Sequence, residues 1–482
     1  MNIRMVFNIL GKMANVEAAL LLLPTAVALC YKESCAISLL ITAAICLTVG
    51  ILLSLIFRPK NHIIYAREGF AIVALVWLFA SLFGALPFYI SGEIPSYIDA
   101  FFETVSGFTT TGASILTDVE AMSKGLIFWR SFTHWVGGMG VLVFIMAITP
   151  NISDRSIHIM RAEMPGPIIG KLVPRVKDTA KILYLIYIVM TITQIILLLC
   201  GGMSLFDSVV HTFGTAGTGG FGIKADSVGG YNPYLQWVIT IFMFLFGINF
   251  NLYYLLLIKH FKSVLHSSEL WTYIGLALTS ITLITINIYP AYDSLSTAIR
   301  DSSFQVSSIM TTTGYSTTDF DLWPVFSKTI LLLLMFIGAC AGSTAGGLKV
   351  SRVVLLFKMI LKEIKRKLHP NSVSTVVFEE IKVDTATLNS VNVYFAIYML
   401  CFSSILLLIS IDDFDFLTNF SAVASCFNNI GPGLAKVGPL LSFADYSDFS
   451  KLALSFAMLL GRLEIFPLLL AFMPSTWIKK AR

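Results

Sequence analysis

Four short stretches rich in glycine and threonine are the residues of this chain best suited to chemistry. They read TTTGA, TGGFG, TTTGY and NNIGPG around Gly112, Gly220, Gly314 and Gly431, which lie 108, 94 and 117 residues apart. Rings of backbone carbonyls can replace the hydration shell of a cation, and glycine permits the φ and ψ values that turn successive carbonyls one way. A unit of this kind used four times predicts a cation pore with pseudo-fourfold symmetry.

The residues expected to coordinate the ion are each glycine and the two residues before it. They are Thr110, Thr111, Gly112, Thr218, Gly219, Gly220, Thr312, Thr313, Gly314, Asn429, Ile430 and Gly431. The competing interpretation is that these stretches are small-residue motifs for packing helices in a membrane. Agreement among four copies in register favours the pore.

Each unit is expected to begin a short helix at the same place. Counting back 13 residues from the glycines reaches the helix-capping residues Asp99, Asp207, Asp301 and Thr418. Each helix would have about 9 residues and a length of roughly 14 Å, about half of a bilayer. A half-membrane helix followed by irregular backbone is a re-entrant pore loop, and its C-terminal negative pole favours a cation.

Composition places the whole chain in a membrane. Of 482 residues, 56% are hydrophobic and 13% charged, and the mean hydropathy is +0.81; soluble globular proteins are less apolar. Long apolar runs lie at about 16–31, 36–57, 69–91, 125–149, 181–203, 234–258, 270–290, 325–361, 391–411 and 449–474. The first run follows a short polar start and has no signal-type cleavage site, so we expect a retained helix.

The predicted fold is therefore an all-α polytopic membrane protein with about ten membrane-spanning segments. Four helix–pore-loop–helix repeats surround one pore in a pseudo-fourfold arrangement, and two leading helices precede them. We expect the leading helices in residues 1–62 and the repeats in 68–150, 178–262, 268–367 and 385–478. No soluble domain is expected, so any sensing of nucleotides would belong to another chain.

The charged residues predict an orientation. The connections on one side carry Arg58, Lys60, Arg67, Arg155, Arg161, Lys171, Arg175, Lys177, Lys181, Lys259, Lys262, Lys358, Lys362, Lys365, Arg366, Lys367, Lys479, Lys480 and Arg482. By the positive-inside rule this side is cytoplasmic, together with both termini. The opposite loops carry Glu93, Asp99, Asp118, Glu120, Asp226, Asp319, Asp321, Asp412, Asp413, Asp415, Asp445 and Asp448. These acids either concentrate cations at the pore mouth or form an ordinary solvated surface.

Other residue types add little chemistry. The seven cysteines lie in or beside apolar runs without metal-like spacing, which is typical of buried small hydrophobic residues. The net charge of +5 is explained by the cytoplasmic loops, so nucleic acid is not an expected partner.

The third repeat carries a helix break after its pore loop. The stretch AGSTAGG at 341–347 interrupts one long apolar run, because glycine, serine and threonine at this density break a helix. Beneath the filter, this loop could obstruct the permeation path as a gate. Two alternatives are a tight helix crossing and a phosphate cradle, although Lys349 is not at P-loop spacing.

An arginine stands inside the last apolar run, where it costs about 2.5–3.5 kcal/mol on the insertion scale. Arg462 and Glu464 are two residues apart and do not share a helix face. We therefore expect Arg462 to meet the pore or the third-repeat loop, and an anchor to backbone carbonyls or to a carboxylate is the alternative to a role in the ion path. The expected gate residues are Gly338, Gly342, Ser343, Thr344, Gly346, Gly347, Lys349 and Arg462.

The stretch HWVGGMG at 134–140 is expected to mark a close helix contact. Its His134, and His211 in the second repeat, are proton-site candidates. A hydrogen-bonded structural histidine is the favoured interpretation for each.

Taken together, the four filters, the two leading helices, GSTAGG followed by Leu348-Lys349, and the arginine in GRLEIF resemble the Trk branch of the Trk/Ktr/HKT superfamily of potassium transporters. The resemblance covers essentially the whole chain. It implies filter glycines that select potassium and accept rubidium, with serine in the first filter associated with sodium passage. It also implies a gating loop at 338–347 and a pore-facing Arg462.

The resemblance further implies partners and a location. These are a homodimer with one pore per subunit, a cytoplasmic ring of nucleotide-binding regulatory subunits, and a bacterial inner membrane. Two departures make the filter chemically uneven: Asn428, Asn429 and Ile430 stand where the first loop has threonines, and Gly217 and Gly219 replace threonines in the second.

The sequence thus predicts potassium uptake through a gated, carbonyl-lined filter. A proton- or sodium-coupled symporter with the same filter remains an alternative. A secondary carrier of another class would need inverted repeats, whereas these units begin and end on the same side. An intramembrane enzyme would need a nucleophile and base or a metal cluster, and no such motif stands in the apolar runs.

Overall fold

The computed structural model describes residues 2–59, 66–140, 176–371, 375–379 and 381–477. Within these ranges the elements are helices apart from one antiparallel hairpin, β1 (Val377–Phe378) and β2 (Ile381–Lys382), and irregular loops connect them. Six helices are long and apolar enough to cross a membrane, and one bent pair makes a possible seventh. The prediction of an all-α polytopic membrane protein is confirmed.

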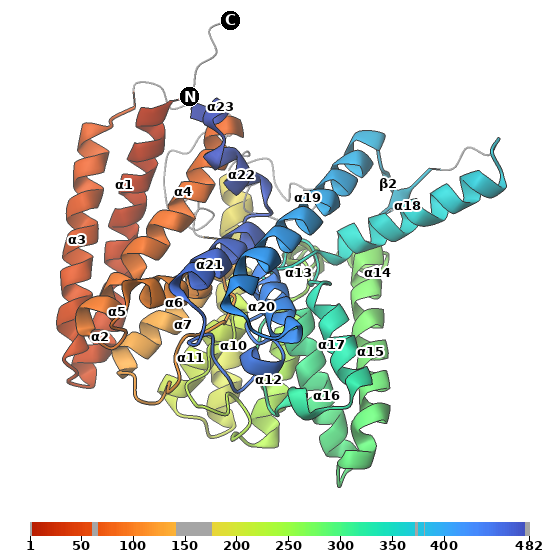
Figure 1. Ribbon diagram of the computed structural model, residues 1–482, viewed down its shortest axis with the longest axis horizontal. Helices are drawn as coiled ribbons and strands as arrows, with labels where there is room; N and C mark the ends of the chain where they lie inside the picture. Colours follow the sequence, from red (N-terminus) through yellow and green to blue (C-terminus); the bar gives the residue numbers. More distant parts are fainter. Residues whose placement is uncertain (1, 60–65, 141–175, 372–374, 380, 478–482) are drawn as a thin grey trace, which may run out of the picture.

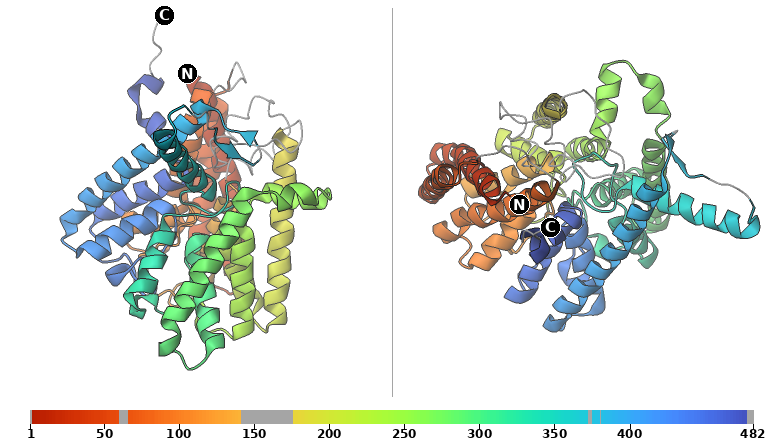
Figure 2. Two further views of the ribbon diagram at one scale, coloured as in Figure 1. Left: turned by 90° about the vertical axis from the view of Figure 1, so that its right-hand side faces the viewer. Right: turned by 90° about the horizontal axis from the view of Figure 1, so that it is seen from above.

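The leading segment forms two antiparallel spans at one edge of the molecule (Figures 1 and 2). Its helices are α1 (Ile3–Leu20), α2 (Leu22–Cys30) and α3 (Cys35–Ile56). The first span begins at Ile3, not near residue 16 as expected, because Asn2 caps the helix and the side-chain amide of buried Asn8 donates to the Ser54 carbonyl at 3.1 Å. The polar residues before residue 16 therefore belong to the first helix.

Four units follow, each with a long helix, a pore helix and a second helix. The first contains α4 (Ala66–Gly84), α5 (Leu86–Ser91), α6 (Tyr97–Phe108) and α7 (Lys124–Gly138). The second contains α10 (Val176–Cys200), α11 (Leu205–Gly217), α12 (Pro233–Phe246), α13 (Phe250–Leu257) and α14 (Phe261–Leu265). The third contains α15 (Ser268–Ile288), η2 (Tyr289–Ala291), α16 (Leu295–Met310), η3 (Phe320–Leu322), α17 (Val325–Met335) and α18 (Val350–Leu368). The fourth contains α19 (Thr385–Ile409), η4 (Ser410–Asp412), α20 (Phe416–Asn428), η5 (Ala435–Val437), α21 (Asp448–Arg462), α22 (Phe466–Phe472) and α23 (Pro474–Trp477).

The pore helices α6, α11, α16 and α20 pack in a cyclic order. Each contacts the second helix of its own unit, in the pairs α6–α7, α11–α12, α16–α17 and α20–α21. Each second helix also contacts the pore helix of the next unit, in the pairs α7–α11, α12–α16, α17–α20 and α21–α6. The last pair joins the fourth unit to the first, so the four units close a ring.

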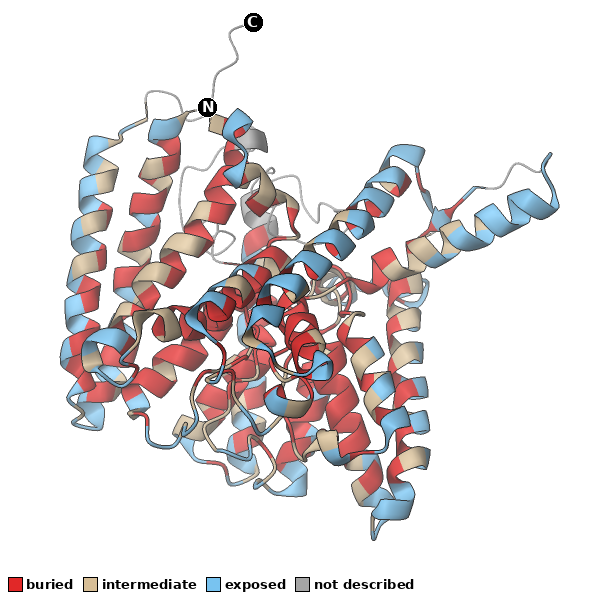
Figure 3. Cartoon of the chain, viewed as in Figure 1, coloured by how far each residue is buried: buried red, intermediate tan, exposed pale blue. Residues whose placement is uncertain are grey.

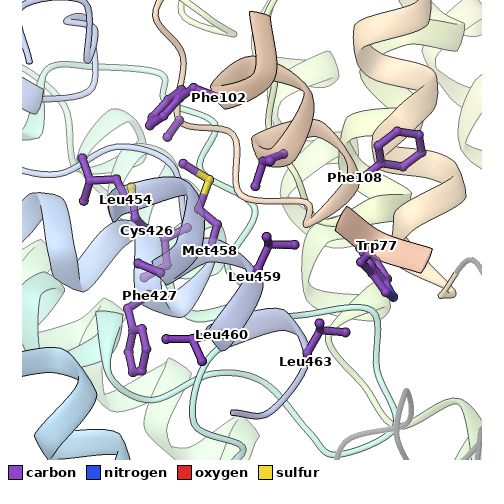
Figure 4. Close-up of a cluster of buried hydrophobic side chains, with 14 of the residues drawn as sticks. Trp77, Phe102, Phe108, Cys426, Phe427, Leu454, Met458, Leu459, Leu460 and Leu463 are labelled. Atoms are coloured by element: carbon purple, nitrogen blue, oxygen red, sulfur yellow. The ribbon is translucent and has the colours of Figure 1, made fainter. Parts of the chain in front are cut away.

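The core of this ring is apolar and dense. Figure 3 shows the pore helices largely buried, while the outer faces of α3 and α18 are exposed. Phe102 of α6, Phe427 of α20 and Met458 of α21 meet in one buried cluster (Figure 4). Apolar side chains from the first and fourth units therefore share one core.

The pore helices begin earlier than expected and are longer. Ser96, Ser204 and Asp415 cap α6, α11 and α20, each accepting a bond from the backbone N–H three residues later. The expected caps Asp99, Asp207 and Thr418 are those donors, and α16 starts after Ser294, well before Asp301. The four helices have 12, 13, 16 and 13 residues. An acid in the first turn of a helix also suits the helix dipole. This is why Asp99 and Asp207 were predicted as caps.

The second helices account for the difference from ten continuous spans. A break at 247–249 bends α12 against α13 by 90°, residues 336–349 separate α17 from α18, and residues 463–465 separate α21 from α22. A break was predicted in the third unit, and the structure interrupts the second helices of the second and fourth units as well. The fourth-unit break contains Glu464 and Ile465 at positive φ, +55° and +66°, and no Gly- or Ser-rich stretch predicts it.

Part of the charge pattern lies outside the described residues. This holds for Lys60, Arg155, Arg161, Lys171, Arg175, Lys479, Lys480 and Arg482, and for the end of the first repeat beyond residue 140.

Candidate functional site

The four predicted glycines come together in one ring. Each has a left-handed φ, +83° at Gly112, +69° at Gly220, +86° at Gly314 and +105° at Gly431. A Cβ atom added to each would meet the carbonyl oxygen of the residue before the next glycine. These distances are 2.1 Å from Gly112 to Gly219, 1.9 Å from Gly220 to Thr313, 2.0 Å from Gly314 to Ile430 and 2.8 Å from Gly431 to Thr111. No side chain fits at these positions without moving a carbonyl of the neighbouring loop.

The loops share one backbone conformation despite their different sequences. The residue two before each glycine is also left-handed, with φ of +55° at Thr110, +56° at Thr218, +56° at Thr312 and +57° at Asn429. A left-handed residue other than glycine costs roughly 1–2 kcal/mol. The surrounding packing imposes this conformation four times.

Eight carbonyls of these loops have no hydrogen-bond partners among the described residues. This applies to both residues before each glycine, all of which are buried. Buried backbone carbonyls are almost always paired. A closed ring of unpaired, buried carbonyl oxygens therefore offers a coordination site for a dehydrated cation.

Hydroxyl groups at the start of two loops bond to the backbone of their own pore helices. The Thr109 hydroxyl donates to the Val105 carbonyl at 2.6 Å, and Thr311 does the same to Ser307. In the fourth loop the Asn429 amide donates to Thr111 Oγ1 at 3.0 Å, bridging to the first loop. The asparagine that makes the ring uneven thus joins two units.

On the side where the chain continues past the glycines, the ring opens into a cavity of about 260 Å³ that all four glycines line. Among the described residues, no Asp or Glu lines this cavity, and the charged residues that do are Arg130 and Lys224. Several of the acids make local contacts instead: Asp99 pairs with Lys451 at 2.6 Å, and Asp415 caps α20. A solvated loop surface, not an acidic pore mouth, is the interpretation that fits.

On the other side of the ring lies the break between α17 and α18, here called the 338–349 loop. The Gly346 N–H donates to Thr312 Oγ1 at 2.7 Å, and a Cβ on Gly346 would lie 2.7 Å from the Asn428 carbonyl oxygen. The space lined by this loop, Arg462 and the ends of the second helices is only about 40 Å³. The loop therefore sits directly against the ring.

The ends of the 338–349 loop are held by backbone and carboxylate contacts. The Gly338 N–H donates to the Leu348 carbonyl at 2.7 Å, which closes the base of the loop. Buried Glu269 accepts from the backbone N–H of Ala341 at 2.7 Å and of Ser351 at 3.1 Å. One carboxylate of α15 thus clamps both arms of the loop.

The remaining loop residues bond within the loop or to the second unit. Ser343 donates to Cys340, Thr344 donates its hydroxyl to the Phe246 carbonyl, and Gly342 accepts from the Phe250 N–H. The Lys349 ammonium donates to the carbonyls of Ala345 and Gly346. A lysine occupied by its own loop does not support the phosphate cradle.

Arg462 joins the loop to the first unit. It donates to the Thr344 carbonyl at 2.7 Å and to the carbonyls of Gly137 and Gly138 at 2.6 and 2.8 Å. Glu464 pairs with Arg352 instead, with nitrogen–oxygen distances of 2.8 and 2.5 Å. Both expectations for Arg462, contact with the loop and anchoring to carbonyls, hold at once.

The glycines of HWVGGMG mark a close contact, as expected. A Cβ on Gly137 would lie 1.9 Å from the Phe108 carbonyl oxygen, and one on Gly138 would lie 2.6 Å from Gly217 Cα. The histidines are buried in packing roles: His134 stacks 4.1 Å from the Phe221 ring, and His211 Nδ1 lies 2.9 Å from the Asp207 carbonyl.

Three charged residues at the site were not predicted from the sequence. Glu103 and Arg130 form a buried ion pair beside the first loop, and Glu269 clamps the 338–349 loop. All three are charges within or at the edge of apolar segments, the same signal that drew attention to Arg462.

A comparison with known proteins identifies the family of this chain. A family model described as TrkH, a cation transport protein, matches residues 37–480. The chain belongs to this family. The match confirms the resemblance to Trk transporters and the expectation of a transporter, not an enzyme.

Two named relatives and one solved structure match this chain along nearly their whole length. The Trk system potassium uptake protein TrkH of Salmonella typhimurium is 37% identical, over 99% of this chain and 100% of its own. TrkG of Escherichia coli, with the same system name, is 33% identical over 99% of both chains. The crystal structure of the potassium transporter TrkH from Vibrio parahaemolyticus has a TM-score of 0.89 and 34% identity, covering 99% of this chain and 100% of that one.

Proposed function

We propose that this chain takes up potassium ions across a membrane through the ring around Gly112, Gly220, Gly314 and Gly431. The observation that carries the proposal is the closed ring of buried carbonyls without hydrogen-bond partners. Relatives along the full length are named as potassium uptake proteins, which supports potassium as the transported ion. Rubidium, which is chemically close to potassium, is expected to be accepted.

Two physical effects favour a cation in this ring. Rings of carbonyl oxygens substitute for the water that an ion loses. The pore helices α6, α11, α16 and α20 end at the four loops, and the C-terminal pole of a helix carries a partial negative charge. The coordinating residues are those of 110–112, 218–220, 312–314 and 429–431.

The pore would be built by the repeats at 68–150, 178–262, 268–367 and 385–478, with 1–62 packed at one edge. The start of α1 and the last helix α23 lie at the same end of the molecule (Figure 1). With the basic connections, this supports two cytoplasmic termini in a bacterial inner membrane.

The 338–349 loop and Arg462 would form the gate. The loop contacts Thr312 of the ring through Gly346, and only about 40 Å³ remains beneath it. The carbonyl bonds of Arg462 hold it against the first unit. An ion leaving the ring toward the cytoplasm has to displace this loop.

Two partners follow from the resemblance to Trk transporters: a second copy of the chain, and a cytoplasmic ring of nucleotide-binding regulatory subunits. Helix α18 projects from the body with exposed apolar residues including Phe357, Ile360 and Ile364 (Figure 1). Such a face suits a protein contact and supports the dimer.

The test is rubidium uptake into liposomes that contain only this purified chain. An outward potassium gradient drives the flux, pH gradients are imposed separately, and sodium is the competitor. Uptake that needs neither a pH nor a sodium gradient supports a selective pore, whereas a requirement for either gradient supports the coupled symporter. Uptake of sodium equal to that of rubidium would refute the proposed selectivity.

A further inference from the structure

The carboxylate of Glu103 holds the backbone that follows the first glycine. Glu103 lies in the first pore helix α6 and its side chain is fully buried. It accepts from the Ile115 backbone N–H at 2.9 Å and from the Ser114 hydroxyl at 2.9 Å. Both residues lie within three positions of Gly112, so the carboxylate fixes how the first loop leaves the ring.

Arg130 extends this support to the second loop. Its Nε lies 2.5 Å from Glu103 Oε1, and its side chain is only 3% exposed. A terminal nitrogen donates to the Gly222 carbonyl at 3.1 Å, and the guanidinium lies 3.4 Å from the centre of the Phe221 ring. Because Phe221 and Gly222 directly follow Gly220, the ion pair connects the exits of two neighbouring loops.

The other three units have no ion pair at the corresponding place, nine residues before each glycine. His211 contacts the Asp207 carbonyl of its own helix, the Gln305 amide has no partner among the described residues, and Ala422 has no polar side-chain atoms. The connection between the first and second loops is therefore chemically distinct within the described ring.

The pair also has an electrostatic consequence for a cation. Arg130 lines the cavity of about 260 Å³ together with Gly112 and Gly220. A positive charge at this position would repel an arriving cation, and Glu103 compensates it at hydrogen-bond distance. Removing one member of a buried ion pair leaves the charge of the other member buried and uncompensated.

We propose that Glu103 and Arg130 are positioning residues that set the spacing between the first and second loops and thereby the preference for potassium over sodium. The proposal rests on the proposed function of the ring. It assigns Glu103 a second role, neutralising Arg130 at the mouth of the pore.

The test measures ion preference without requiring an open gate. A ligand that binds only the folded protein stabilises it by RT ln(1 + [L]/Kd), so the increase of stability with potassium or sodium concentration gives a dissociation constant for each ion, and the ratio of the two constants reports the preference. In Glu103→Gln, we expect the potassium-over-sodium ratio to fall about tenfold, the change that a charge-assisted contact of ordinary strength produces.

The double variant Glu103→Gln/Arg130→Met separates the two roles. Rubidium uptake into liposomes is expected to fall in Glu103→Gln, because Arg130 is left uncompensated, and to recover in the double variant while the altered ratio remains. The control is Asp99→Asn, which breaks an ion pair with Lys451 one turn earlier on the same helix and is expected to keep the wild-type ratio.

If Glu103→Gln does not fold, Arg130→Lys serves instead. It keeps the charge beside Glu103 but loses the guanidinium fork that bonds Glu103 and Gly222 at the same time, and it is expected to lower the ratio as well. A wild-type ratio in all folded variants at this pair would overturn the inference. A wild-type protein without any preference for potassium would instead refute the function proposed for the ring.

Discussion

Replacing Arg462 by methionine tests how the 338–349 loop is held. Of the three described carbonyl bonds of Arg462, one, to Thr344 at 2.7 Å, reaches the loop, and two reach Gly137 and Gly138. Methionine fills similar apolar space but donates no hydrogen bond, so the loop loses its connection to the first unit.

The size of the effect follows from that single contact. A hydrogen bond to a charged group contributes about 1.5–3 kcal/mol. At 1.4 kcal/mol per factor of ten, its loss raises the ratio of released to held loop by about 10- to 150-fold. Because the loop contacts the ring directly, we expect the initial rate of rubidium uptake to rise by up to this factor.

The assay is uptake into liposomes containing the purified chain, with the amount of folded protein matched between variants. Arg462→Lys is the informative control, since lysine keeps the positive charge but cannot bridge the carbonyls of Thr344, Gly137 and Gly138 together. Anchoring predicts faster uptake in both variants. Unchanged uptake in Arg462→Met, or faster uptake in methionine alone, would refute the anchoring argument; the second result would point to charge repulsion.

Three further substitutions test other contacts. Gly112→Ser puts a Cβ 2.1 Å from the Gly219 carbonyl oxygen; relief of roughly 1–2 kcal/mol of strain by moving this carbonyl should lower the rubidium-over-sodium uptake ratio by about 5- to 30-fold, and an unchanged ratio would count against the ring. Glu269→Gln keeps the shape of the clamp but removes its charge, so basal rubidium uptake should rise; equal uptake would mean that the carboxylate does not restrain the loop. Gly137→Val drives a Cβ to 1.9 Å from the Phe108 carbonyl oxygen and should destabilise the protein by about 1–3 kcal/mol or more, seen as a lower melting temperature in detergent; an unchanged temperature would contradict the close contact.

The ring could be predicted from the sequence because its signal repeats. One glycine-threonine stretch is uninformative, but four at matching positions indicate one backbone conformation, and Gly112, Gly220, Gly314 and Gly431 indeed share a left-handed φ. The contact of Arg462 with loop carbonyls also followed from a simple rule, that a charge in an apolar segment needs polar company.

Contacts between residues that lie far apart in the chain could not be predicted from the sequence. Glu103 and Arg130 are 27 positions apart, and which carboxylate would meet which guanidinium depends on how α6 packs against α7. The helix starts were displaced because serine and aspartate both cap helices, and Ser96 with Asp99 offers two starts within one turn. The break at Ile465 was not predicted from the sequence because a β-branched residue rarely has a positive φ.

The most direct measurement of the central claim is anomalous diffraction at the rubidium edge from crystals grown in rubidium in place of potassium. The account predicts a rubidium peak on the axis of the ring, level with the carbonyls of Thr111, Gly219, Thr313 and Ile430. Rubidium peaks elsewhere with none at the ring, from crystals in which the loops are ordered, would contradict it.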